Sequence, residues 1–153
     1  MTKLKGRRIL ITGATSRLGL AMAQALAGAG ARVAVVELDV RDESSVRACA
    51  ERTFDRLGGI DMLVNNAGIG MRTVNPRLLS EPQPFWRVSL DGFREVLDTK
   101  ATGVFLMARA VVPRMLEAGG GRVINITRNK QTMTRRESSR TVRPAPPSRR
   151  SPA

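Results

Sequence analysis

The stretch Arg8-Ile-Leu-Ile-Thr-Gly-Ala-Thr-Ser-Arg-Leu-Gly19 runs from an apolar segment through a glycine turn into a periodic segment. Its apolar part, 8–12, predicts a short buried strand. The apolar positions over 18–29 recur at helical spacing, and Gly28 and Gly30 predict the end of that helix. A glycine turn between strand and helix lets a diphosphate reach backbone N–H groups at the start of the helix. The alternative is that these small residues serve only close packing.

Strand and helix patterns alternate along the rest of the chain. Apolar runs predict strands at 32–36, 60–64 and 122–126, and helical spacing predicts helices over 42–57 and about 90–116. Asp42 is placed to cap the first of these helices. This order is typical of an α/β fold, here a partial doubly wound (Rossmann-type) parallel sheet of about four strands.

The charge of the chain is concentrated at its end. Of the net charge of +13, the segment 128–153 supplies +7, with eight Lys/Arg and one acid. The segment also holds four prolines and no aromatic residue. Such a composition buries too little surface to offset its ordering entropy. We therefore expect one domain over 1–127 and a disordered basic Pro/Arg-rich tail over 128–153. Nucleic-acid binding is disfavoured because the tail has no aromatic side chain to stack on a base.

Composition also bears on the compartment. The chain has one cysteine, Cys49, so no internal disulfide is expected. No stretch approaches the ~20 apolar residues of a membrane span, and no signal peptide is recognised. We expect a cytoplasmic protein without a membrane partner or a metal site. Self-association, if present, is expected to use the helix 90–116.

A second motif makes the glycine turn more specific. Asn65-Asn66-Ala67-Gly68 follows the predicted strand 60–64. Together with Thr12-Gly-Ala-Thr-Ser-Arg-Leu-Gly19, it resembles the short-chain dehydrogenase/reductase family, whose motifs are T-G-x-x-x-G-x-G and N-N-A-G. The resemblance covers Lys3 to about Glu137 and implies an NAD(P)-dependent oxidoreductase. By this resemblance, 1–127 would be an incomplete dinucleotide-binding domain.

The resemblance also implies which residues would bind the cofactor. The residues that would line the phosphates are Gly13, Ser16, Leu18 and Gly19. Those that would pass beside the adenosine ribose are Asn66, Ala67 and Gly68. Arg17 replaces the usual middle glycine, as in some branches of the family, and its side chain could meet a phosphate directly.

Glu37 bears on the choice between NAD and NADP. It ends the second predicted strand, 24 residues past Gly13, where the family places its ribose-selecting acid. A carboxylate there accepts hydrogen bonds from both ribose hydroxyls and repels a 2′-phosphate, which favours NAD over NADP. The alternative is an ordinary acid at a strand end.

The chain departs from the family directly after Glu37. Leu38-Asp39-Val40 resembles the end of the family's third strand, where the aspartate and the residue after it meet the adenine. The second crossover, about two dozen residues, is then missing between Glu37 and Leu38. Parallel neighbours need a crossover of about a dozen residues or more, so adjacent residues cannot end both strands. Either the edge strand is lost or Asp39 leaves the adenine site.

The family's reaction centre has no counterpart here. Family members use an asparagine, a serine, a tyrosine and a lysine. The asparagine place is Lys100, and the serine place is Arg128, with the Thr127 hydroxyl one residue early. The chain has no tyrosine, and no lysine follows Lys130. We therefore expect a catalytically inactive chain with weak dinucleotide binding. The alternatives are a non-enzymatic protein that binds through its basic tail, or a truncated product without function.

One interpretation of the tail is a change of reading frame. Residues 140–150 can be back-translated with synonymous codons so that another frame reads Y-G-P-S-R-A-A-L-E-A, which resembles the family's tyrosine helix. The tyrosine then falls across Arg140 and Thr141, thirteen places after Arg128. The nucleotide sequence over these codons decides between a shifted frame and a selected basic tail.

Overall fold

The computed structural model describes residues 4–15, 17–77, 80–81 and 83–127. Within them, one parallel sheet has the strand order β2-β1-β3-β4. Its strands are β1 (Arg8–Ile11), β2 (Arg32–Val35), β3 (Met62–Asn65) and β4 (Arg122–Asn125). This confirms the predicted α/β sheet of about four strands. The tail predicted over 128–153 lies outside the described residues, so the division into domain and tail stays a prediction.

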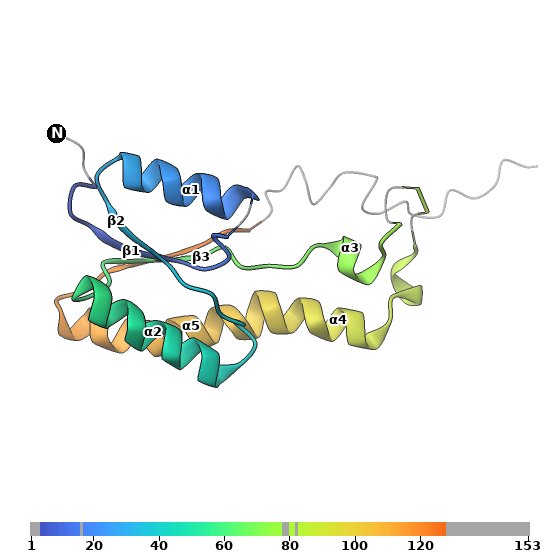
Figure 1. Cartoon of the computed structure of the whole chain (residues 1–153). Helices are drawn as coiled ribbons and strands as arrows, with labels where there is room; N and C mark the ends of the chain where they lie inside the picture. Colours follow the sequence, from blue (N-terminus) through green and yellow to red (C-terminus); the bar gives the residue numbers. More distant parts are fainter. Residues whose placement is uncertain (1–3, 16, 78–79, 82, 128–153) are drawn as a thin grey trace, which may run out of the picture.

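Helices cover both faces of the sheet (Figure 1). Helix α1 (Arg17–Gly28) lies on one face, and α2 (Glu43–Leu57) and α5 (Gly103–Glu117) lie on the other. Because successive strand residues point to opposite faces, Ile11 packs toward α1 whereas Leu10 packs toward α2 and α5. The chain thus winds from β1 to β2 over one face and crosses to β3 over the other.

The ends of α2 follow from single residues. The carboxylate of Asp42 accepts a hydrogen bond from the Ser44 N–H at 2.9 Å, which makes it the N-cap that the sequence predicts. At the other end, Gly58 takes the left-handed conformation, with φ of 71°. Strand β3 was predicted to begin at Ile60 but begins two residues later. The reason is that its hydrogen-bonded ladder with β1 starts at the Ile9–Met62 pair.

The long helix predicted at 90–116 is one continuous helical run with an irregular centre. It consists of α4 (Leu90–Leu97), the π-helical turn η2 (Asp98–Thr102) and α5. In the turn, the Thr99 hydroxyl donates to the Glu95 carbonyl at 2.9 Å. The sequence did not predict the π turn, a feature that is frequent at functional sites. The short elements α3 (Met71–Val74) and η1 (Phe85–Arg87) lie between the predicted strand 60–64 and the predicted helix 90–116, where no element was predicted.

The segment after β2 answers the question raised by the missing crossover. No residue between Val36 and Arg41 belongs to a strand, so β2 is an edge of the described sheet. The family's next strand is therefore lost, the first of the two alternatives. Val40 is instead buried against α5, where a Cβ added to Gly103 would lie only 2.7 Å from its Cγ2 atom. The bare backbone of Gly103 lets the shortened connection pack directly on the helix.

An ion pair fastens the amino end of the sheet. The Arg8 guanidinium donates to both carboxylate oxygens of Asp61, with Nη2–Oδ1 2.7 Å and Nε–Oδ2 3.2 Å, and also to the Gly58 carbonyl at 2.6 Å. The Arg8 backbone N–H adds a bond to Asp61 at 2.8 Å. These hydrogen bonds hold the pKa of the Asp61 carboxyl below its usual range. The pair joins β1 to the start of β3.

We expect Asp61→Asn to lower the free energy of unfolding by about 1–2 kcal/mol at neutral pH, because a charge-assisted pair is lost. The pKa of Asp61 is lower in the folded chain than in the unfolded chain, where it is about 3.9. The stability that the ion pair contributes is therefore fully present above about pH 4, and it is lost as the pH falls through the pKa of the folded chain. The difference between wild type and variant should therefore shrink below about pH 4. Urea unfolding across pH measures it. Asp91→Asn is the control, because the Asp91 side chain is 96% exposed. A gap that persists unchanged at the lowest pH would contradict the assignment.

Candidate functional site

The register of the sheet brings the two motifs to one edge. Ile11 pairs with Val35 on one side and with Val64 on the other. Gly13, Glu37 and Asn66 each follow two residues after these paired positions, so all three leave the carboxyl ends of adjacent strands at the same level. The winding of the chain reverses between β1 and β3. Ligands of doubly wound sheets bind at such a switch point.

Thr12 and Asn66 hold the two loops together. The Thr12 hydroxyl oxygen accepts hydrogen bonds from the N–H groups of Asn66 (3.1 Å) and Ala67 (3.0 Å). In the other direction, the Asn66 side-chain amide donates to the carbonyl oxygens of Thr12 (3.1 Å) and Gly13 (2.9 Å). Thr12 is 1% exposed. The sequence analysis did not predict these hydrogen bonds, which we call the clamp. The threonine at the first place of the glycine motif, Thr12, is the feature of the sequence that could have indicated them.

Two glycines of the turn have no room for a side chain. Gly13 has φ of 63°, and a Cβ there would lie 2.9 Å from the Ala67 Cα. A Cβ on Gly19 would overlap the Gly13 carbonyl oxygen and lie 2.6 Å from the Asn66 amide nitrogen. The predicted close packing is therefore real. It also brings the start of α1 to the end of β1, where the first N–H groups of a helix have no intrahelical acceptor.

We expect Gly19→Ala to destabilise the chain by about 1–3 kcal/mol, because the added methyl group forces backbone to move. Gly28→Ala is the matched control in the same helix. A Cβ on Gly28 meets nothing within 4 Å. That change should be neutral or stabilising by up to about 1 kcal/mol. Chemical unfolding of both variants measures the contrast. Equal stability of the two variants would show that the turn is looser than the structure has it.

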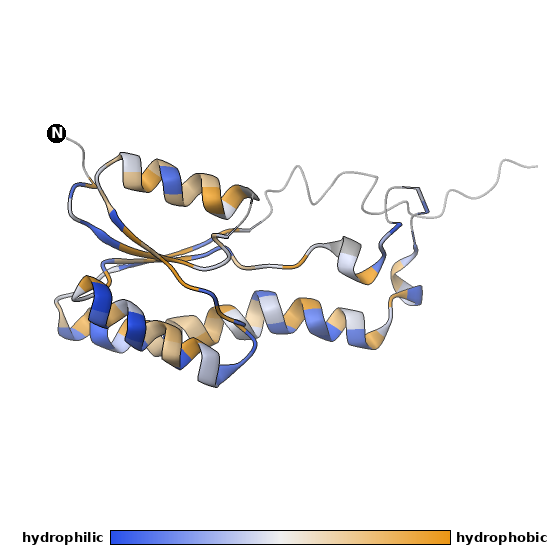
Figure 2. Ribbon diagram, in the orientation of Figure 1, coloured by the Kyte–Doolittle hydropathy of each residue, from blue (hydrophilic) through white to orange (hydrophobic). Residues whose placement is uncertain are grey.

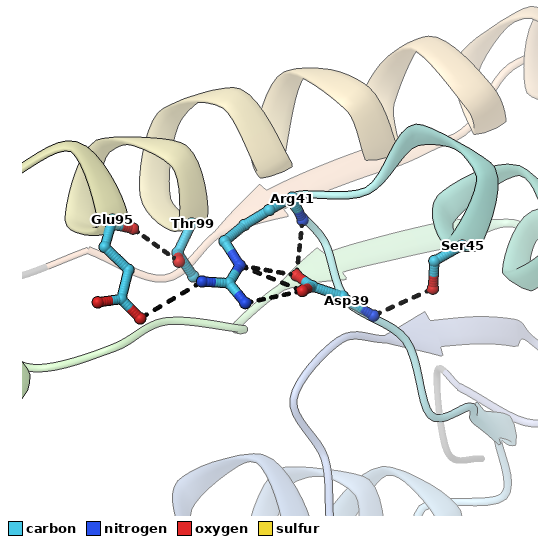
Figure 3. A network of polar contacts seen from close by, with 5 residues as sticks. All are labelled: Asp39, Arg41, Ser45, Glu95 and Thr99. Carbon is cyan, nitrogen blue, oxygen red and sulfur yellow. Dashed lines mark hydrogen bonds and ion pairs between the residues drawn. The ribbon is translucent and has the colours of Figure 1, made fainter. Parts of the chain in front are cut away.

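The residues predicted at the adenosine ribose and at the adenine, Glu37 and Asp39, have different surroundings in the structure. Glu37 is exposed, two residues beyond the end of β2. Asp39 is bound to Arg41 (Figure 3), with Nη2–Oδ2 2.8 Å and Nε–Oδ1 3.0 Å, and the Arg41 N–H donates to the same carboxylate at 2.9 Å. Arg41 also reaches Glu95 of α4 at 3.3 Å. Arg41 thereby holds the pKa of Asp39 below its usual range. Both Asp39 oxygens are engaged in fastening the shortened connection to α4.

The remaining predicted residues are distributed as follows. Leu18 is 57% exposed on the first turn of α1, and Arg17 is the first residue of that helix. Ser16 and Arg128 lie outside the described residues. Thr127 is exposed, two residues after β4. Of the places that the family's reaction centre occupies, Lys100 is the only one within the described residues. Its side chain lies beside Gly68.

A pair of asparagines, Asn65 and Asn125, also lies at this edge of the sheet. Asn65 is 5% exposed, and its side-chain amide donates to the Asn125 side chain at 2.9 Å across the β3–β4 ladder. Its own Oδ1 atom has no hydrogen-bond partner among the described residues. Sequence reasoning gave Asn65 no role, because its partner lies sixty residues away in the chain. The pair joins β3, which leads into the Asn66-Ala67-Gly68 loop, to β4.

Two further classes of site find no support in the part of the chain that the structure describes. It contains no group of three or more His, Cys, Asp or Glu side chains that could hold a metal ion. None of its helices has the length and apolar character needed to cross a bilayer.

Comparison with known proteins decides the family. A family model described as enoyl-(acyl carrier protein) reductase matches residues 2–139. The chain is a member of the short-chain dehydrogenase/reductase family. The T-G and N-N-A-G motifs of this short-chain dehydrogenase/reductase are the two loops that Thr12 and Asn66 hold together.

Relatives and solved structures agree with this assignment. The chain is 36% identical to D-threitol dehydrogenase of Mycolicibacterium smegmatis, over 86% of this chain and 56% of the relative. It is similar to the 3-ketoacyl-(acyl-carrier-protein) reductase of Brucella melitensis complexed with NADH, with a TM-score of 0.71, 30% identity and coverage of 80% and 57%. A gluconate 5-dehydrogenase of Burkholderia cenocepacia, in complex with NADP and tartrate, gives a TM-score of 0.69, 30% identity and coverage of 81% and 54%.

The chain spans about half the length of the curated relatives it matches. The alignment lengths show that part of the difference is internal. That with D-threitol dehydrogenase runs over 155 positions but uses only 86% of the 153 residues here. About two dozen aligned residues of the relative therefore have no counterpart in this chain. A deficit of that size equals the crossover expected, and not found, after Glu37.

Proposed function

We propose that this short-chain dehydrogenase/reductase chain binds a dinucleotide, NAD in preference to NADP, and does not catalyse hydride transfer. The observation that carries the proposal is the clamp between the glycine turn and the Asn66-Ala67-Gly68 loop at the switch point of the sheet. It builds the phosphate-facing edge without any side chain at Gly13 or Gly19. Solved relatives that carry NADH or NADP in the same fold support a dinucleotide as the ligand.

The residues present fit three parts of such a ligand unequally: its phosphates, its adenosine ribose and its adenine. At the phosphate end, the start of α1 offers N–H donors and a favourable helix dipole. At the ribose end, the exposed Glu37 carboxylate can accept hydrogen bonds from both hydroxyl groups and repel a 2′-phosphate. At the adenine end, the family's aspartate is held by Arg41. We therefore propose weak binding, with affinity no better than high micromolar.

The chain's own residues would bind and orient the dinucleotide but would not move a proton. When bound, NAD supplies a hydride acceptor. Oxidation of an alcohol also requires a base for the hydroxyl proton and a donor that holds the carbonyl oxygen. The sequence has no tyrosine for the first role, and arginine occupies the serine place. The proposed inactivity rests on these residues.

The test of the proposed function is calorimetric titration of NAD and NADP into the full chain. We expect a dissociation constant for NAD in the high micromolar range or above, and weaker binding of NADP. Gly13→Val should abolish binding, because a branched side chain at φ of 63° blocks the approach of phosphate to the backbone. Gly28→Ala, at the far end of α1, should bind like wild type. Unchanged affinity in Gly13→Val, with its circular dichroism unchanged, would place the ligand elsewhere.

We also propose that the chain self-associates through α4, η2 and α5. Large apolar side chains are exposed at helical spacing along this run. They are Leu90, Phe93, Leu97, Phe105 and Leu116. Figure 2 shows hydrophobic residues recurring along α4, away from the sheet. Exposed apolar side chains that form a contiguous patch mark interaction sites in soluble proteins.

A further inference from the structure

Lys100 lies where the family's relay has an amide, and the structure places its side chain along the Asn66-Ala67-Gly68 loop. Its Cε atom is 3.4 Å, and its Nζ atom 3.7 Å, from a Cβ built on Gly68. The residue belongs to the π turn η2 and is exposed. The stem therefore runs over the bare backbone of Gly68 and presents its ammonium group at the loop.

The two acids nearest to Lys100 in the sequence, Glu95 and Asp98, are engaged with other groups. Glu95 pairs with Arg41 at 3.3 Å, and Asp98 accepts from the Thr102 hydroxyl at 3.4 Å. Among the described residues, Lys100 itself has no ion-pair partner within 4.0 Å. Its positive charge is therefore available to a ligand.

A chain of short contacts leads from the glycine turn to this ammonium group. The Cβ position of Gly13 is 2.9 Å from the Ala67 Cα, Gly68 follows Ala67, and the Lys100 side chain lies on Gly68. Since consecutive Cα atoms are about 3.8 Å apart, the ammonium lies on the order of 10 Å from the turn. That distance is within the reach of a ligand whose diphosphate sits at the turn and whose second ribose extends beyond it.

We propose that Lys100 is a binding residue for the diphosphate–ribose segment of the dinucleotide. This inference rests on the proposed function. An ammonium group acts as a compact positive charge toward phosphate and donates hydrogen bonds to ribose oxygens. The substitution that removes the family's relay amide thus adds a cation to the binding edge. Lys100 contributes to affinity rather than to proton transfer.

Lysine labelling tests the position of the group without any turnover. The lysines of the chain are Lys3, Lys5, Lys100 and Lys130. With NAD at about ten times its dissociation constant, acetylation of Lys100 should slow by up to about tenfold. Lys5 is the internal control, because it is exposed at the opposite end of the sheet, beside Gly30. Mass spectrometry reads both sites in one sample. Equal labelling of Lys100 with and without NAD would overturn the proposal.

Affinity for fragments separates this inference from the proposed function. Lys100→Met should weaken ADP-ribose binding by about 3- to 10-fold, the range of a partly exposed charge-assisted contact. AMP, which lacks the diphosphate and the second ribose, should lose less than about 2-fold. Lys100→Arg should restore most of the loss, and Lys5→Met should change nothing. Equal affinity of wild type and Lys100→Met for ADP-ribose would overturn the role of Lys100 alone. Failure of the wild type to bind NAD or ADP-ribose would reject the proposed function and this inference with it.

Discussion

Incubated with NAD and a panel of primary and secondary alcohols, the chain should form no NADH above the rate without protein. General acid/base catalysis is typically worth about 10²–10⁴-fold, and the groups that provide it in the family are absent here. Donors aimed at the developing charge on the carbonyl oxygen are worth a further ~10²–10³-fold. Without general acid/base catalysis and without donors to the carbonyl oxygen, we expect any residual rate of hydride transfer to lie below detection.

Two side chains stand at or next to the places of the missing groups, and both are badly suited to replace them. Lys100 carries an ammonium group, which has no lone pair with which to accept a proton, and its stem lies on Gly68 of the Asn66-Ala67-Gly68 loop. Thr127 is exposed, two residues after β4, and no described base contacts it. A hydroxyl without a neighbouring base neither removes a proton nor becomes a nucleophile. The expected null result therefore follows from residue types and from their placement.

The assay follows NADH absorbance at NAD concentrations above the calorimetric dissociation constant, so that weak binding cannot hide turnover. Gly13→Val is assayed in parallel, because contaminating dehydrogenase activity would be unaffected by that change. Sustained NADH formation by the wild type that disappears in Gly13→Val would overturn the inactive assignment. Activity that is equal in both samples belongs to a contaminant.

Local patterns predicted most of the fold. Each strand follows from a short apolar run, and the start of α2 follows from one capping carboxylate, Asp42, because these features act over a few neighbouring residues. The π turn could not be predicted in this way. In the π turn, the Gly103 N–H donates to the Asp98 carbonyl, five residues earlier, and such a change of backbone acceptor leaves no pattern of side chains in the sequence.

In the candidate site, too, the sequence predicted the features that local motifs encode and did not predict the contacts between distant residues. The motifs predicted that the turn at Gly13 and the loop at Asn66 would belong together, and four hydrogen bonds join the two loops. The sequence did not predict the partner of Asp39. Its carboxylate is bound by Arg41, which also reaches Glu95, fifty-four residues away. Contacts of that separation depend on how the shortened connection packs against α4, which no local pattern records.

The second large effect concerns stability. Helix α1 has polar side chains only at Arg17 and Gln24, and Figure 2 shows it hydrophobic along most of its length. A helix that is apolar on all sides belongs inside a protein core. Among the described elements it is the only helix on its face of the sheet, and Leu18 and Leu20 are 57% and 41% exposed. On the edge strand next to it, Val35 is 39% exposed. The described fold thus leaves apolar surface uncovered beside α1 as well as along α4 and α5.

The size of this effect is comparable with the stability of a whole domain. At about 25 cal/mol per Å², leaving ~400 Å² of apolar surface in water forgoes on the order of 10 kcal/mol. Typical domains have a net free energy of unfolding of about 5–15 kcal/mol. Both edges of the sheet, β2 and β4, also carry unpaired backbone groups in the described structure, and such edges promote association.

We therefore expect the chain of 153 residues to associate, to bind hydrophobic dyes and to unfold over a broad temperature range. Differential scanning calorimetry and sedimentation velocity at several concentrations measure these properties. Phe105→Glu, at a 60% exposed position of α5, should reduce association without lowering the melting temperature, because the side chain is not part of the buried core. Leu63→Ala, at a fully buried position, should instead destabilise the fold by about 2–5 kcal/mol. A sharp, reversible, concentration-independent transition above about 50 °C would show that the exposed apolar surface is covered in solution and would refute the expectation.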